Sequence, residues 1–482
     1  MSKLEVDAIE PQSGTTLTLG ASGDTVVVPS GVQLAPGGGL TLTGALVVDG
    51  GTIKLDGNYP TGTDNVALGD TALDSLTSGG QNIALGAAAL TANTTGSYNV
   101  AVGRNSGTSN TTGELNIFIG DSAGKCNLTG TKNTAIGYSS LYNNTTSNNT
   151  AVGYTSLYAN TTGASNVAVG SGALDANTTA SSNTAVGFES LKANTTAGNN
   201  TALGYLSLTA NTTGDTNVAI GYAPLYTNTT GTNNVAVGSL ALRNNTTADN
   251  NTAVGNCSLR NNTTGGYNTA MGSEALCSNT TGATNVAVGR QALKSNTEGT
   301  RNTAVGLQAG LNTTTGNDNT AIGACALNNN TTGASNTAVG KASLQDNTTG
   351  TLNNAFGSGA LLANITGNCN VAMGNDALRF NTTGTSNTGL GTLALSSNTT
   401  AANNTAVGFC ALYTNTTGAN NTSVGRRSML DNTTGAGNTA LGVNALENNT
   451  TAADNVAIGL SSMAANTTGI SNVAVGVTAL DE

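Results

Sequence analysis

The chain has 482 residues, a formal net charge of −10, and charged residues at only 8% of its positions. It contains no histidine, which excludes imidazole catalysis and histidine metal sites. The acidic balance leaves no basic patch for nucleic acid or for an anionic membrane surface.

The first residues lack the apolar core of a signal peptide, and no run approaches the roughly 20 apolar residues of a membrane span. We therefore expect synthesis in the cytoplasm without a signal peptide and no membrane insertion. A protein of this kind that works outside the cell needs lysis or a dedicated exporter for its release.

Residues 1–64 are predicted to form a β-rich cap or docking region. Alternating apolar residues predict short strands at 16–19, 25–28, 40–43 and 45–48, and glycine and aspartate separate them. This region lacks the repeat that fills the rest of the chain.

From Asn65 onward the sequence repeats every 17 residues, with one 16-residue step from Asn133 to Asn149. The motif reads Asn-[Thr/Val]-Ala-[Val/Ile/Leu]-Gly-x-x-[Ala/Ser]-Leu-x-x-Asn-Thr-Thr-[Gly/Ala]-x-x, and its first asparagine is called position 1 below. A period of this kind is typical of a stacked repeat architecture. Residues 65–482 are therefore predicted to be one shaft of 25 repeats, of which the last is incomplete.

One repeat is too short and has the wrong periodicity for a helix. Positions 1–5, such as 166–170, predict a strand; positions 7–10, such as 172–175, predict a second strand; a turn follows at 177–180. The predicted fold is all-β, a β-solenoid (β-roll) of 17-residue coils. At about 4.8 Å per coil, 25 coils make a rod of roughly 120 Å.

Two columns are invariant: asparagine at position 1 and glycine at position 5. Stacked buried asparagines are expected to bond to each other from coil to coil, and the glycines are expected to take positive φ or to leave room for a close neighbour. The predicted structural ladder is represented by Asn166, Asn183, Asn200, Gly170, Gly187 and Gly204.

Two further columns are nearly regular. A second asparagine column at position 12 is broken only by Leu76 and Thr313, and its Asn-Thr-Thr triplets predict turn ladders more readily than glycosylation sites. Leucine dominates position 9, where Gly107, Gly124 and Gly310 predict thin spots in the core.

The position-4 aliphatic residues, such as Val169, leave two arrangements open. If the alanines at position 3 and the leucines at position 9 fill the interior, position 4 points outward, because neighbouring strand residues face opposite sides. The resulting apolar stripe needs burial between chains, which favours a homotrimeric fibre. Alternatively, positions 4 and 9 both lie inside a monomeric solenoid.

Tyrosines recur on neighbouring coils: Tyr138 and Tyr154 share position 6, and Tyr142 and Tyr158 share position 10. Stacking that stiffens the rod is one interpretation. A strip that contacts a cell-surface polysaccharide is the other.

The six cysteines do not predict a disulfide framework. Cys257, Cys325 and Cys410 share position 7 but never occur in adjacent repeats, so these sulfurs are expected to lie several coils apart.

The carboxylates form no recurring pair, and no phosphate-binding loop or calcium-binding repeat occurs. We predict no enzymatic activity, no catalytic or metal site and no cofactor.

The Asn-Thr-Ala-Val-Gly core, as at 183–187 and 251–255, resembles the repeats of trimeric autotransporter adhesin heads. The likeness covers about five residues of each repeat and implies a trimeric left-handed β-roll. The full repeat and the opening residues 2–20 are similar to bacteriophage tail-fibre and virion appendage proteins. That resemblance implies a structural fibre assembled in the cytoplasm.

These features together predict a structural fibre protein that forms an elongated rod, as in a phage tail fibre or virion appendage. The alternatives are a self-polymerising extracellular filament and a carbohydrate-binding adhesin. The expected partners are copies of the chain, as a homotrimer and as a head-to-tail filament in which residues 1–64 dock on C-terminal coils, and a virion or distal fibre protein. The expected location is the virion or the extracellular space.

Overall fold

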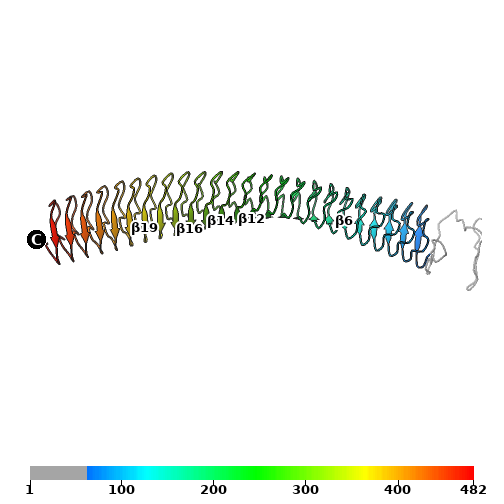
Figure 1. Ribbon diagram of the computed structural model, residues 1–482, viewed down its shortest axis with the longest axis horizontal. Coiled ribbons are helices and arrows are strands. Elements are labelled where there is room, and N and C mark those ends of the chain that lie inside the picture. Colours follow the sequence, from blue (N-terminus) through cyan, green and yellow to red (C-terminus); the bar gives the residue numbers. More distant parts are fainter. Residues whose placement is uncertain (1–61, 482) are drawn as a thin grey trace, which may run out of the picture. The chain divides into compact units, whose positions relative to one another are not determined.

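The computed structural model describes residues 62–481 and shows an all-β solenoid in which each coil contributes one short strand (Figure 1). Within these residues there is no helix, and therefore none that is long and apolar enough to cross a membrane. Each strand has three residues, at positions 2–4 of the repeat. The strands are β1 (Val66–Leu68), β2 (Ile83–Leu85), β3 (Val100–Val102), β4 (Ile117–Ile119), β5 (Thr134–Ile136), β6 (Thr150–Val152), β7 (Val167–Val169), β8 (Thr184–Val186), β9 (Thr201–Leu203), β10 (Val218–Ile220), β11 (Val235–Val237), β12 (Thr252–Val254), β13 (Thr269–Met271), β14 (Val286–Val288), β15 (Thr303–Val305), β16 (Thr320–Ile322), β17 (Thr337–Val339), β18 (Asn354–Phe356), β19 (Val371–Met373), β20 (Thr388–Leu390), β21 (Thr405–Val407), β22 (Thr422–Val424), β23 (Thr439–Leu441), β24 (Val456–Ile458) and β25 (Val473–Val475).

Consecutive strands pair in parallel and in register, so that each residue stacks on its equivalent in the next coil. Between β7 and β8, for example, Ala168 pairs with Ala185. The register survives the 16-residue coil, where Thr134 of β5 pairs with Thr150 of β6. The turn of this coil is one residue shorter than in the other coils. In most of those coils the side-chain amide of the position-1 asparagine donates to the carbonyl of position 15. In this coil, Nδ2 of Asn133 donates instead to the Thr146 carbonyl of position 14, at 2.7 Å.

The predicted second strand at positions 7–10 is wrong, because this segment is a turn. Leu174 at position 9 has φ +52° and Gly172 at position 7 has φ +66°, both in the left-handed region. A non-glycine residue in that region costs roughly 1–2 kcal/mol. The turn still bonds to the next coil, since the Leu174 N–H donates to the Ser190 carbonyl at 3.0 Å.

The interior contains the position-3 alanines and the position-9 leucines, which decides between the two arrangements left open by the sequence. Ala168 and Leu174 are both completely buried. The position-4 side chains face outward instead, and Leu203, Ile322 and Leu441 are 44%, 40% and 48% exposed. The arrangement with positions 4 and 9 both inside is therefore wrong.

The thin spots expected at Gly107 and Gly124 are filled by a compensating residue. Phe118 lies in β4 and replaces the usual alanine at repeat position 3; it is fully buried. Its ring occupies the space that a side chain at either glycine would enter. At Gly310 the nearest atom to such a side chain is Cδ2 of Leu293, at 3.0 Å. One large residue thus replaces two leucines on neighbouring coils.

The strands predicted within residues 1–64 lie outside the described residues, which begin at Gly62. Coil-to-coil hydrogen bonding already includes Thr63, whose carbonyl accepts the Gln81 N–H at 2.8 Å.

Candidate functional site

The position-1 asparagines form a buried ladder along the solenoid, which confirms the predicted stacking of asparagines. The backbone N–H of Asn183 donates to Oδ1 of Asn166 at 3.0 Å, and that of Asn200 donates to Oδ1 of Asn183 at 2.9 Å. The N–H donors and the Oδ1 acceptors of this ladder are buried, and a buried polar group without a partner would be destabilising. The ladder therefore couples every coil to the one before it through a side chain as well as through the sheet.

The position-12 asparagines form a second ladder that meets the first. Nδ2 of Asn177 donates to Oδ1 of Asn160 at 2.8 Å and to the Ala180 carbonyl at 3.1 Å. Nδ2 of Asn166 donates to the same carbonyl at 2.9 Å. The two ladders thus share one acceptor in the coil, which explains why both columns need a primary amide, with donor and acceptor atoms on one short side chain.

The second ladder is interrupted where threonine replaces asparagine at position 12. Oγ1 of Thr313 and Oδ1 of Asn296 are buried, and neither has a hydrogen-bond partner among the described residues. Nδ2 of Asn330 in the next coil keeps only its bond to the Gly333 carbonyl, at 3.0 Å. This coil also has Gly310 in the leucine column, so it lacks the usual side chain in two of its buried columns.

The glycine column at position 5 meets both expectations for it. Gly170, Gly187 and Gly204 have φ of +136°, +136° and +128°. A Cβ on Gly187 would overlap the carbonyl of Gly204 in the next coil. A glycine is required here because the coils approach each other through their backbones.

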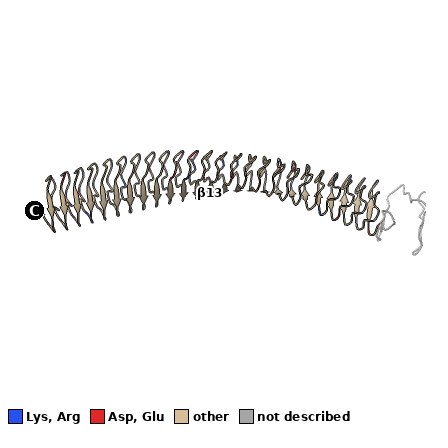
Figure 2. Cartoon of the chain, viewed as in Figure 1, with Lys and Arg blue, Asp and Glu red and all other residues tan. Residues whose placement is uncertain are grey.

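The outer face of the sheet carries no charged residue on any of the 25 described strands. Its side chains come from positions 2 and 4 and are mainly threonine, valine, isoleucine and leucine. Charged residues are sparse along the stack (Figure 2), and those of the repeats lie at turn positions. Arg104 and Asp121, for example, form a 2.8 Å ion pair at position 6 of neighbouring coils, and the hydrogen bond from Arg104 lowers the pKa of Asp121.

The predicted tyrosine pairs do stack from coil to coil. The ring centroids of Tyr138 and Tyr154 are 5.4 Å apart with an 11° angle between planes, and those of Tyr142 and Tyr158 are 5.1 Å apart at 32°. The faces of Tyr138 and Tyr154 are turned toward each other, so only the outer faces of a column remain available to a ligand.

A second aromatic column lies on the same edge of the solenoid and includes a residue that the sequence analysis overlooked. Phe188 stacks on Tyr205 at 5.5 Å and 13°, and Tyr205 stacks on Tyr222 at 5.5 Å and 7°. All three rings are about half exposed. Reading position 6 for every aromatic residue, rather than for tyrosine alone, identifies Phe188.

The two position-6 columns are separated by one coil, in which Ser171 occupies that position. The gap between the rings of Tyr154 and Phe188 is therefore two coils, or about 10 Å. Nearby, Lys192 and Glu189 form a 2.6 Å ion pair. Burial raises the pKa of Asp175, Lys192 lowers it and Glu189 raises it.

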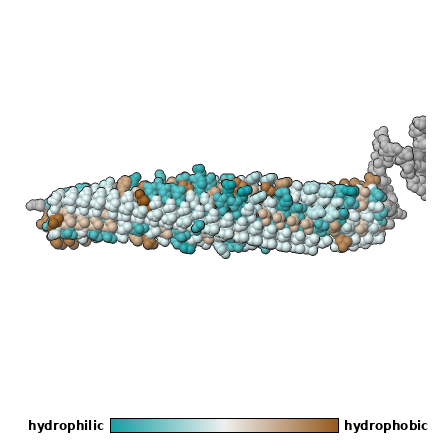
Figure 3. Space-filling model, turned by 90° about the horizontal axis from the view of Figure 1, so that it is seen from above, coloured by the Kyte–Doolittle hydropathy of each residue, from teal (hydrophilic) through white to brown (hydrophobic). Residues whose placement is uncertain are grey.

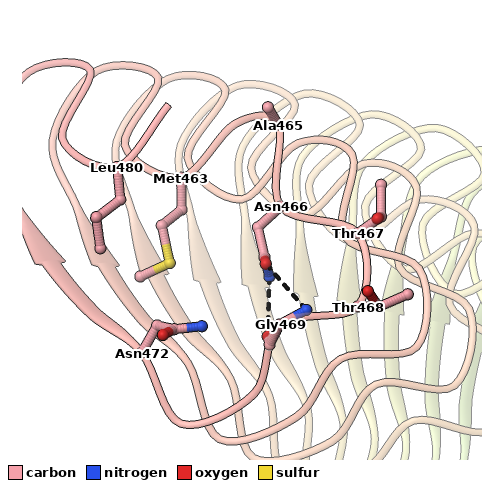
Figure 4. Close-up of a pocket in the computed structure, with 8 residues that line it drawn as sticks. All are labelled: Met463, Ala465, Asn466, Thr467, Thr468, Gly469, Asn472 and Leu480. Atoms are coloured by element: carbon pink, nitrogen blue, oxygen red, sulfur yellow. Dashed lines mark hydrogen bonds between the residues drawn. The ribbon is translucent and has the colours of Figure 1, made fainter. Parts of the chain in front are cut away.

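The cavity shown in Figure 4 lies at the last coil, where no later coil covers the interior in the described residues. Met463 and Leu480 line it. Nδ2 of Asn466 donates to the Gly469 carbonyl at 3.1 Å and to Oδ1 of Asn449 in the preceding coil at 3.4 Å. Its Oδ1 accepts the Gly469 N–H of its own coil, at 3.1 Å. Brown apolar side chains gather at this end of the stack in Figure 3. The cavity is an uncovered end of the core, with none of the converging charges of a catalytic site.

Across residues 62–481, no group of three or more cysteine and acidic side chains is arranged to hold a metal ion. Comparisons of the chain with protein-family models and with curated proteins give no match. The outer sheet face and the aromatic columns are therefore the surfaces on which a function can be argued.

Proposed function

We propose that this protein is a structural fibre: an elongated rod that assembles as a homotrimer and serves as a tail fibre or other appendage of a virion. The elongated β-solenoid supports a structural role, because its buried side chains form ladders that repeat from coil to coil. The virion assignment rests on the resemblance of the repeat and of residues 2–20. On this proposal the rod acts outside the cell, and no enzymatic step is involved.

The uncharged outer face of the sheet is the observation that carries the trimer. A sheet face that lies in water usually carries polar and charged residues, and this face has no charged residue on the 25 described strands. An apolar stripe of that length is expected to be buried against other chains. Three copies around one axis bury the stripe of every copy and leave the charged turns in water.

Sedimentation equilibrium of the full chain tests this assembly. We expect three times the chain mass of 47.2 kDa. Replacing Leu203 and Ile322 with lysine places charges on the stripe at exposed positions, so the single chains should fold and fail to associate. Ser239→Lys, at a turn position, is the matched control and should remain trimeric. A wild-type protein that sediments as a monomer would refute the trimer and leave the rod intact.

A self-polymerising filament is the nearest alternative, with residues 1–64 of one trimer docking on the C-terminal coils of the next. Deleting residues 1–30 should then abolish end-to-end association and preserve the shaft. Filaments that persist in the deletion variant would exclude this form of docking.

A second candidate function, glycan binding, is favoured by the gap at Ser171. A ring placed midway between Tyr154 and Phe188 lies about 5 Å from each, within the range of stacked aromatic rings. A pyranose that enters the gap would stack between the rings of Tyr154 and Phe188, at the level of Ser171. The polar groups of Asp175, Glu189 and Lys192 are nearby to bond its hydroxyls. The tyrosines predicted as glycan contacts would then contribute mainly through Tyr154.

The test is saturation-transfer NMR with free glucose, galactose, mannose and their N-acetylated amino sugars. The Ser171→Tyr variant fills the gap and should lose the transfer, whereas Ser239→Tyr, which extends the ladder beyond Tyr222, should retain it. Transfer that is absent from every sugar, or unchanged in Ser171→Tyr, would leave stacking as the sole role of these rings.

A further inference from the structure

Two cysteines that look unrelated in the sequence are neighbours in the solenoid. Cys257 occupies position 7 of its coil, and Cys277 occupies position 10 of the next. Their separation of 20 residues is one coil of 17 plus three residues. Both thiols are free and partly exposed.

The same diagonal pair of positions brings side chains into contact in other coils. At position 10, the hydroxyls of Thr91, Thr108 and Thr209 each donate to the backbone carbonyl of position 7 in the preceding coil, at 2.8, 2.9 and 3.1 Å. A cysteine sulfur is attached to Cβ as a threonine hydroxyl is. A position-10 sulfur can therefore lie directly over the position-7 residue.

Longer side chains on this diagonal also meet. Nζ of Lys294 at position 10 lies 2.7 Å from Oε2 of Glu274 at position 7 of the coil before. Arg427 at position 7 and Glu447 at position 10 of the next coil form a 2.5 Å ion pair. Side chains at both positions of the diagonal thus point toward each other.

The backbones around the two cysteines are already fixed in register. The Asn261 N–H donates to the Cys277 carbonyl at 3.1 Å, and the Glu274 N–H donates to the Asn256 carbonyl at 2.9 Å. Burial raises the pKa of the Cys277 thiol, and the neighbouring Cys257 raises it further, as expected for two groups that repel each other when ionised. The two thiols therefore lie on adjacent coils whose backbones are hydrogen-bonded to each other.

We propose that Cys257 and Cys277 are a cross-linking site, at which a low-molecular-weight disulfide such as oxidised glutathione converts the two thiols into an intramolecular disulfide between neighbouring coils. One cysteine thiolate attacks the glutathione disulfide and releases the first glutathione thiolate. The other cysteine thiolate then attacks the mixed disulfide and releases the second. The two protons of the cysteines end on two glutathione thiols, so the protein is oxidised and glutathione is reduced.

The bond would join coils 251–267 and 268–284 covalently, in addition to their ladders. A protein kept reduced during synthesis would acquire it on reaching an oxidising environment. Residues 257 and 277 could then separate no further than the disulfide allows, even if the segment between them unfolded.

The chain supplies its own controls. Cys325 and Cys410 also occupy position 7, but the next coils carry Gln345 and Leu430 at position 10. Neither has a sulfur on its diagonal, so neither can form the same bond.

The experiment counts thiols in the denatured full chain before and after incubation of the native protein with oxidised glutathione. The count should fall from six to four, with no glutathione retained, and peptide mapping should join the segments that contain Cys257 and Cys277. Cys257→Ser and Cys277→Ser should each abolish the linked peptide, and Cys325→Ser and Cys410→Ser should keep it. A thiol count that stays at six, glutathione adducts in place of the linked peptide, or disulfides only between chains would each overturn the proposal.

Discussion

Restoring asparagine at residue 313, where the second asparagine ladder is interrupted, should stabilise the shaft. A substitution that stabilises is a stricter test of the ladder than one that destabilises. In a Thr313→Asn variant, the new Nδ2 is placed to donate to Oδ1 of Asn296, which now has no partner among the described residues. The new Oδ1 is placed to accept from Asn330. The equivalent Asn110 and Asn127 make such bonds, at 2.9 and 2.8 Å, in coils that also have glycine at position 9.

The gain can be estimated from the unpaired groups. Leaving one buried polar group unpaired costs about 1–3 kcal/mol, so pairing Asn296 should contribute about 2 kcal/mol to local stability. Since 1.4 kcal/mol is a factor of ten, amide exchange in the flanking coils should slow about 30-fold.

Hydrogen–deuterium exchange of peptides from residues 285–334 measures this effect directly. Thr315→Asn is the matched control, because Thr315 is exposed in the same turn. Exchange that is unchanged or faster in Thr313→Asn, with the control at wild-type rates, would refute the view that the second ladder holds the coils together.

Three further predictions concern the glycine column, the repacked core and pH. Gly187→Ala should destabilise the local coils by about 3 kcal/mol or more, because it combines strain at φ +136° with overlap of the next backbone, and exchange should accelerate at least 100-fold. Phe118→Ala should lower local stability by about 3–5 kcal/mol, and adding Gly124→Leu should restore part of it in a thermal melt, since φ +58° at Gly124 matches the leucine column. The melting temperature should change little on acidification, because the ladders do not titrate and the carboxyls with a lowered pKa, Asp121, Glu274 and Asp318, belong to surface ion pairs, which contribute little to stability. Their contribution is lost as pH falls below the ordinary pKa values of 3.8 for aspartate and 4.5 for glutamate, whereas the raised pKa of Asp175 means that its protonation relieves a cost of burial.

Each of these predictions has an internal comparison. Gly172→Ala should cost only about 1–2 kcal/mol, because φ there is +66°, a left-handed value that leucines at position 9 also adopt, and a Cβ would meet only Cγ of Glu189, at 3.5 Å. Equal damage from Gly172→Ala and Gly187→Ala would contradict the close-approach argument. Failure of Gly124→Leu to improve Phe118→Ala would contradict the repacked core, and a steep loss of stability between pH 6 and pH 4 would show that titrating groups dominate.

The sequence predicts the solenoid well because the same residue type recurs at the same position of every repeat. The invariant asparagine and glycine at positions 1 and 5 indicate ladders and close backbones without reference to local strand propensity. The outward direction of position 4 needed the structure, since alternation alone allows either face to be the interior.

The sequence predicts the turn at positions 7–10 poorly, because leucine gives no sign of a left-handed backbone. Side-chain propensity favours a strand at Leu174, and the coil-to-coil hydrogen bonds and burial of the leucine override it. Relations also cross coils: Phe118 fills space beside Gly107 and Gly124, and Cys277 occupies the position diagonal to Cys257 in the next coil. Reading one column at a time misses both.

On the proposed assembly, stacked coils form a rod whose outer sheet face joins three chains. Electron micrographs of the purified full chain, averaged in side and end views, test it most directly. We expect a shaft of uniform length, about 120 Å for 25 coils, with three-fold symmetry in end views. Compact particles would contradict the solenoid, and slender shafts one coil wide with no three-fold end view would contradict the assembly.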